Sequence, residues 1–151
     1  VLRPAESDDF EWVADLMDRT LRPFYGGDHR AHAERIFDTH MNGGIDYVGH
    51  FSSGQHMFLA EVDGQRAGLI HVVDKKQSTV KISPLIILPE FRGHGVGNSL
   101  LKYAENYAAE CGSRQLYCTV AHPNKHALGY LLWQGFRLTG PDQGPHNPGC
   151  A

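Results

Sequence analysis

The sequence predicts an α/β (α+β) domain in which a mixed central sheet carries helices on its faces. Three observations lead to this prediction. Apolar runs typical of strands alternate along the chain with segments that keep helical spacing. Turn-forming glycine, asparagine and aspartate residues separate these segments. The resulting order is β-α-α-β-β-β-α-β-α-β, and strands divided by helices in this way form layered sheets.

The first three elements are a strand and two helices. Residues 1–4 are predicted to form a short strand, and Asp8 with Glu11 three positions later forms a capping box. Apolar residues then keep helical spacing over residues 10–21. A glycine pair ends that helix, and a second helix is predicted over residues 28–41.

Three strands follow in the middle of the chain. Residues 45–55 are rich in glycine and serine and are predicted to form a loop. The strands are expected at 57–62, 67–73 and 79–88. The Asp63-Gly64 pair between the first two is a strong hairpin signal.

A glycine-rich segment, residues 89–98 (PEFRGHGVGN), joins the third of these strands to the next helix. Its glycines let the chain turn so that backbone N–H groups point at one spot. The start of the helix adds unpaired N–H donors and a partial positive charge. Arg92 adds a full positive charge. This combination predicts a binding site for a phosphate-bearing ligand.

Four elements complete the chain. The helix after the glycine-rich segment covers residues 99–108. A strand is predicted over 115–121, a helix over 124–134 and a last strand over 136–139. With the strands above, they complete a single domain over residues 1–151, whose ends have the composition of trimmed or disordered termini.

Three known glycine-loop motifs can be compared with residues 89–98. A Walker loop requires Gly-Lys-Ser/Thr, but Gly97 is followed by Asn98. A dinucleotide fingerprint requires a glycine where Asn98 stands. The pattern Arg-x-x-Gly-x-Gly is satisfied by Arg92, Gly95 and Gly97. It resembles the coenzyme A diphosphate loop of the GNAT superfamily of N-acetyltransferases.

A second motif strengthens this resemblance. In the family, an asparagine opens a helix, an alanine follows three positions later, and Gly-Phe closes the motif. Asn124, Ala127, Gly135 and Phe136 stand in that register. The resemblance covers residues 80–138 well and implies transfer of an acetyl group from acetyl-CoA to a primary amine.

The resemblance also implies where the coenzyme binds. The fourth and fifth strands of this fold are parallel and splay apart, and the pantetheine arm lies between them. The backbone N–H of Ile87 is expected to polarise the thioester carbonyl and to hold the oxyanion. Asn124 would bind the pantetheine amides, or act only as an N-cap. The expected coenzyme contacts are Leu85, Ile86, Ile87, Arg92, Gly93, His94, Gly95, Val96, Gly97, Asn98 and Asn124.

The sequence does not identify the general base, because residues 81–84 lack the carboxylate that many members of the family carry there. The candidates are Glu61, Asp74, His71 and His122. His122 is preferred because it follows the splayed strand and an imidazole titrates near neutral pH. A solvated charge on a strand or turn is the preferred interpretation of each carboxylate, and a hydrogen-bonded core histidine that of His71.

The sequence does not identify the general acid either. Relatives often use a tyrosine at the position that Leu131 occupies here. Tyr130 lies one residue earlier, about 100° away around a helix. Either Tyr130 serves as the acid, or the thiolate leaves without assistance.

Composition limits the partners. The net charge is −3, which argues against a nucleic-acid-binding protein. No apolar run is long enough for a membrane span. Three cysteines without metal-like spacing predict free thiols in a cytoplasmic protein. The ten histidines include His29 and His32 at helical spacing, but no carboxylate or cysteine cluster joins them, so no metal site is predicted.

Specificity is expected from the first two helices and from the loop that follows them, where the family varies most. The residues considered are Asp28, Glu34, Asp46, Tyr47, His50 and Phe51. Two other functions stay open at this point: a non-catalytic acyl-CoA sensor, and an acyltransferase that uses a longer acyl-CoA. A homodimer is a further open alternative.

Overall fold

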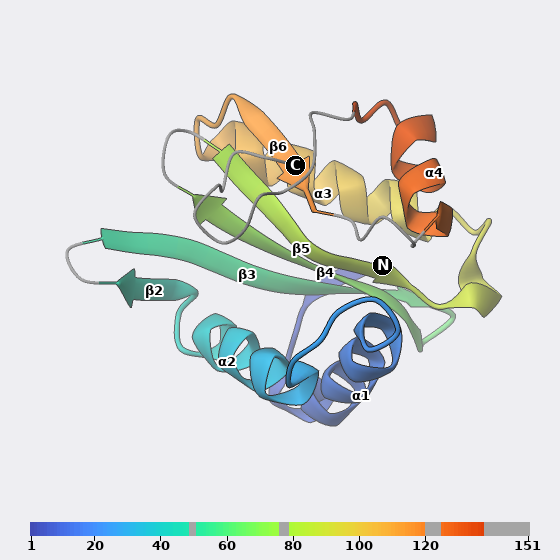
Figure 1. The fold of residues 1–151 in the computed structure, drawn as a ribbon, viewed down its shortest axis with the longest axis horizontal. Helices are drawn as coiled ribbons and strands as arrows, with labels where there is room; N and C mark the ends of the chain where they lie inside the picture. The colour runs from blue at the N-terminus through green and yellow to red at the C-terminus, as the bar shows by residue number, and fades with distance from the viewer. Residues whose placement is uncertain (49–50, 76–78, 120–124, 138–151) are drawn as a thin grey trace.

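The computed structural model describes residues 1–48, 51–75, 79–119 and 125–137, without the side chains of residues 45–53. Figure 1 shows a twisted sheet between two pairs of helices, with α1 (Phe10–Leu21) and α2 (His29–Met41) on one face. On the other face lie α3 (Val96–Glu110) and α4 (Lys125–Trp133). None of the helices described is both long and apolar enough to cross a bilayer.

The sheet has the strand order β1-β3-β4-β5-β6, and β2 pairs with β3 beside this path. Its strands are β1 (Leu2–Pro4), β2 (Ile45–Val48), β3 (Phe51–Val62), β4 (Gln65–Lys75), β5 (Thr79–Ile87) and β6 (Gln115–Cys118). The β5–β6 pair is parallel and the other pairs are antiparallel. The predicted mixed α+β sheet with one parallel pair is therefore confirmed.

Two hydrophobic clusters hold the helices to the sheet. The first joins α1 and α2 to one face through residues such as Val13, Met17 and Phe37. The second joins α3 to the opposite face through Leu100 and Ala104, among others. Because consecutive strand residues point to opposite faces, each strand contributes side chains to both clusters.

A buried carboxylate fixes the N-terminus of α1. Asp9 is fully buried and accepts hydrogen bonds from Arg3 at 2.7 and 2.9 Å and from Arg66 at 2.8 Å. Burial works to raise the pKa of Asp9, but these arginines and a backbone N–H outweigh it and hold the pKa far below its usual range. The predicted Asp8–Glu11 capping box is wrong. The box is formed by Glu6 and Asp9, one short 3₁₀ turn, η1 (Ser7–Asp9), before the helix.

The predicted loop over residues 45–55 is also wrong. Residues 45–48 form β2, and β3 already begins at residue 51. Backbone pairing with β2 holds this stretch as a strand although its composition is typical of a loop. At Gly54, an added Cβ would lie 2.7 Å from the Tyr107 hydroxyl, so the small residue serves close packing.

The remaining boundaries agree with the prediction to within a few residues, with one exception. The β3–β4 hairpin turns at Asp63 and Gly64, both with positive φ, as the Asp-Gly signal predicts. The predicted last strand over 136–139 is not present at residues 136–137, and the rest of it lies outside the described residues.

Candidate active site

A β-bulge divides β5 into two halves. Ile70 of β4 pairs with Leu85, and Val72 pairs with Ile82, so that Ser83 and Pro84 together face the single residue His71. A bulge of this kind bends a strand and interrupts its pairing. Pairing of β5 with β6 ends at Ile82, the last residue before the bulge. Among the described residues, the second half of β5 thus has no partner in β6, and the splaying predicted for these two strands involves residues 120–124, which lie outside the description.

The bulge also determines which way the backbone of β5 points. The Leu88 N–H donates to the Ala67 carbonyl at 2.9 Å, toward β4. Alternate residues of a strand direct their N–H groups to opposite sides. The N–H groups of Ile87 and Leu85 therefore point away from β4, toward the side on which β6 pairs with the first half of β5.

Backbone amides gather where α3 begins. Gly93 and Gly95 have φ values of 85° and 78°, in the left-handed region that favours glycine. Among the residues described, the His94 N–H has a backbone acceptor, the Phe91 carbonyl at 3.3 Å. The first intrahelical bond is donated by Ser99 to the Gly95 carbonyl. Within the described ranges no acceptor is recorded for the N–H groups of residues 93 and 95–98, so this helix start can receive an anion.

The third glycine of the motif has a different role. The φ of Gly97 is not in the left-handed region, but a Cβ there would overlap the Tyr130 hydroxyl. Gln134 links the two helices by donating to the Asn98 side chain at 2.6 Å, with a longer bond of 3.4 Å to Tyr130. Burial raises the pKa of Tyr130, so its hydroxyl remains a donor at neutral pH.

One cavity connects these features. Its volume is about 1060 Å³, which is slightly above the usual range of ligand-binding clefts. It begins at the glycine-rich segment, follows β5, passes the end of β6 and α4, and reaches α1 and α2. Every predicted coenzyme contact among the described residues lines it except His94.

The end of the cavity near α1 and α2 contains polar groups that the sequence analysis did not assign to the site. Lys81, on the first half of β5, lines it together with His29 and His32 of α2. The Nε2–H of His29 donates to the Tyr25 carbonyl at 2.8 Å, which fixes its tautomer. Only the i, i+3 spacing of the two histidines was visible in the sequence, and nothing in it indicated that they line one cavity with Lys81.

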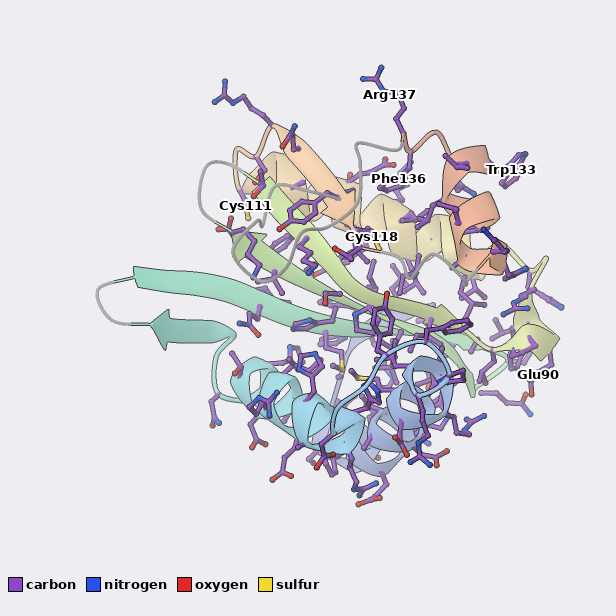
Figure 2. The ribbon with its side chains drawn as sticks, viewed as in Figure 1. Glu90, Cys111, Cys118, Trp133, Phe136 and Arg137 are labelled. Atoms are coloured by element: carbon purple, nitrogen blue, oxygen red, sulfur yellow. The ribbon has the colours of Figure 1, made fainter. Side chains whose placement is uncertain are left out.

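Cys118 lies at the end of β6, beside this part of the cavity (Figure 2). Burial raises the pKa of its thiol to about 11. The thiol is therefore neutral at physiological pH and is a poor nucleophile. We assign it no part in acyl transfer.

The candidates for the general base do not converge in this cavity. Glu61 lies in a second, polar hollow and forms an ion pair with Arg3 at 3.3 Å. Asp74 lies outside the cavity lining as well. His71 is 1% exposed, and its Nδ1–H donates to the Ser83 carbonyl at 2.7 Å, which matches the hydrogen-bonded core histidine considered above. His122 and Asn124 lie outside the described residues.

No group of three or more His, Cys, Asp or Glu side chains suited to a metal ion occurs within the described ranges. His29 and His32 face the cavity, and neither is joined there by a carboxylate from the part of the chain described. The site is thus built from backbone amides, cationic side chains and apolar surface.

Comparison with known proteins agrees with this geometry. The model of the acetyltransferase (GNAT) family matches residues 13–136. Spermidine N(1)-acetyltransferase of Escherichia coli (strain K12) is 26% identical over 145 residues, which cover 92% of this chain and 73% of the relative.

Solved structures show the same fold. A GNAT-family acetyltransferase from Staphylococcus aureus Mu50 has a TM-score of 0.76 at 14% identity, covering 97% of this chain and 89% of the other. The PaiA N-acetyltransferase from Thermoplasma acidophilum, solved in complex with coenzyme A, has a TM-score of 0.70 at 16% identity, with 95% and 92% coverage.

Proposed function

Because the chain belongs to the acetyltransferase (GNAT) family, and is an N-acetyltransferase that takes its acetyl group from acetyl-CoA, we propose a route for this transfer through the cavity along β5. The observation that carries the route is the continuity of the cavity. It joins the free amides at the start of α3 to the outward-pointing amides of β5 and then to α1 and α2.

The diphosphate of coenzyme A binds at the start of α3. The N–H groups of Gly93 and of residues 95–98 donate to its oxygens, and the helix dipole adds favourable potential. Arg92 borders the same cavity and supplies a full positive charge. Tyr130, with its hydroxyl against Gly97, is placed to contact the coenzyme at this end.

The pantetheine arm runs along the second half of β5 in the manner of an added strand. The outward N–H and C=O groups of Leu85 and the C=O of Ile87 bind its amides, while Ile86 lines the arm. Asn124 is the expected partner of the arm from the opposite side. The Ile87 N–H polarises the thioester carbonyl and stabilises the oxyanion of the tetrahedral intermediate.

The acceptor amine must lose a proton before it attacks. A lysine-like amine has a pKa of about 10.4, but a nearby cation disfavours its charged form. Lys81 supplies such a cation at the α1–α2 end of the cavity. We retain His122 as the base, acting directly or through water. Tyr130 lies at the diphosphate end, so we favour departure of the thiolate without a protein acid.

Binding of coenzyme A to an Arg92→Ala variant tests the assignment of the diphosphate site. The change removes one charge-assisted hydrogen bond, which corresponds to roughly tenfold weaker affinity or more. Titration calorimetry with coenzyme A measures it. Arg114→Ala is the matched control, because Arg114 is exposed and lies outside the cavity. Equal affinity in the two variants would remove Arg92 from the site.

Turnover is measured by the release of coenzyme A thiol from acetyl-CoA with a panel of primary amines. Propionyl- and butyryl-CoA in the same assay determine the acyl length. Saturable binding of acetyl-CoA without thiol release for any amine would contradict the route.

We further propose that residues 1–151 act as one catalytic domain in the cytoplasm. Cys111 and Cys118 are free thiols, as expected in a reducing compartment.

A further inference from the structure

The charge of the cavity gives information about the acceptor, provided that the proposed function holds. None of the described residues that line the cavity is Asp or Glu. The cationic side chains among them are Arg19, Lys81 and Arg92. The sequence contains 17 Asp and Glu residues, and the structure describes the side chains of all of them except Asp46 and Asp142. The described lining of the cavity is therefore cationic.

A cavity of this kind is poorly suited to a polycation. An ammonium group that leaves water requires a carboxylate or several acceptors to offset its desolvation. A polyamine such as spermidine would bring two or more charges of the same sign as the cavity. Like charges brought together at a binding site select against such a ligand.

Lys81 is distinct from the other two cations. Arg19 already pairs with Asp15 at 3.0 Å, and Arg92 lies at the coenzyme end of the cavity. No ion pair of Lys81 is recorded with any of the described residues. Its neighbours Val80 and Ile82 belong to the cluster under α3, so alternation directs Lys81 to the opposite face, toward α2.

His32 of α2 lines the same cavity as Lys81. Burial, followed by neighbouring cations that include Lys81, lowers the pKa of His32, so the ring is neutral at physiological pH. Arg35 donates to its Nδ1 at 3.4 Å, and a guanidinium has no acceptor, so the ring proton is on Nε2. Lys81 and His32 thus provide two hydrogen-bond donors and no carboxylate.

We propose that the acceptor is an amino-acid-like molecule: a primary amine that also carries an anionic group, which Lys81 and His32 bind. An apolar or aromatic body would lie against the adjoining lining residues Leu16, Leu21, Phe24 and Tyr25. The neutral amine nitrogen attacks the thioester carbon and forms the C–N bond, the C–S bond breaks, and the proton that the nitrogen loses passes through solvent to the departing thiolate, which becomes the coenzyme A thiol. The anionic group takes no part in the chemistry and only positions the acceptor.

The test compares amines that differ only in the anionic group. Phenylalanine is compared with phenethylamine, and O-phosphoethanolamine with ethanolamine, to separate carboxylate from phosphate. Spermidine represents the polycations. Thiol release gives kcat/KM for each. We expect the anionic member of at least one pair to be favoured about tenfold or more, mainly through KM.

Variants of Lys81 identify the residue responsible. Lys81→Met should bring the members of the favoured pair to within about threefold, and Lys81→Arg should retain most of the preference. Lys102→Met is the control, since Lys102 is exposed on α3 outside the cavity. Unchanged affinity for coenzyme A shows that Lys81→Met leaves the fold and the coenzyme site intact. Spermidine or an uncharged partner as the better acceptor, or a preference unaffected by Lys81→Met, would overturn the inference.

A binding measurement separates this inference from the proposed function. N-acetylphenylalanine and N-acetylphenethylamine are titrated into the protein saturated with coenzyme A. Tighter binding of the acid, lost in Lys81→Met, supports the anion site even where no amine is acetylated, and in that case only the proposed function fails. Equal binding of the two compounds contradicts the anion site.

Discussion

Acidification tests the environment of His71, the residue that faces the bulge of β5. Its Nδ1–H donates to the Ser83 carbonyl at 2.7 Å, and its Nε2 is buried without a hydrogen-bond partner among the described residues. Burial lowers the pKa of His71 to about 4. In the unfolded chain the pKa of a histidine is about 6.5.

The sign of the effect follows from this difference. Below about pH 6.5 the unfolded chain binds a proton that the folded protein does not, so the free energy of unfolding falls as the pH falls. Each unit of pKa difference corresponds to about 1.4 kcal/mol. The contribution of His71 is complete above about pH 6.5, is reduced by about 2 kcal/mol near pH 5, and reaches a loss of about 3 kcal/mol once the folded protein is also protonated.

Urea denaturation of the protein and of a His71→Gln variant, at about pH 7.5 and about pH 5, measures this contribution. Both proteins lose stability on acidification, because other groups also titrate. The variant should lose about 2 kcal/mol less than the unmodified protein between the two conditions. His126→Gln, on exposed α4, is the control and should leave the loss unchanged. Equal losses for His71→Gln and the unmodified protein would refute the reasoning. If the variant does not fold, an NMR titration measures the pKa of His71 in the unmodified protein. A pKa near 6.5 would then refute the reasoning.

Two further predictions concern packing. Gly97→Ala should cost roughly 1–3 kcal/mol of stability and weaken coenzyme A binding, since the added methyl group displaces Tyr130; chemical denaturation and calorimetry measure the two effects. Gly26→Ala, where the added methyl group meets nothing within 4 Å, should change neither. Asp9→Asn should lower the free energy of unfolding by about 3 kcal/mol at neutral pH, because it breaks a buried ion pair with two arginines. Asp8→Asn, at an exposed position, should cost less than about 0.5 kcal/mol, and a similar loss in both variants would contradict this account of Asp9.

The elements that the sequence predicted correctly are those with strong local signals. The helices α1, α2, α3 and α4 keep apolar spacing, and Asp63-Gly64 allows few backbone conformations other than a tight turn. The stretch over residues 45–55 has no such signal. Its described residues belong to two strands, because β2 and β3 pair with each other, and such pairing is not visible in composition.

The site divides in the same way. Residues 89–98 alone indicated a candidate anion site, because the role proposed for them depends on backbone geometry that glycine permits. Glu61 was considered as a base because of its residue type and strand position, but Arg3 pairs with it outside the cavity. Lys81 and His32 are 49 positions apart in the sequence, and only the packing of α2 against the sheet brings them to one cavity.

The extra residue at Ser83-Pro84 has a consequence for the whole of β5. Before it, even-numbered side chains such as Ile82 face α3, and after it, odd-numbered ones such as Ile87 do. Deleting one of the two residues would restore a continuous ladder. Each side chain in the first half of β5 would then point to the opposite face of the sheet. Lys81 would then point into the apolar layer under α3. The insertion or deletion of one residue at this point would therefore exchange the side chains of β5 that face the cavity with those that face α3.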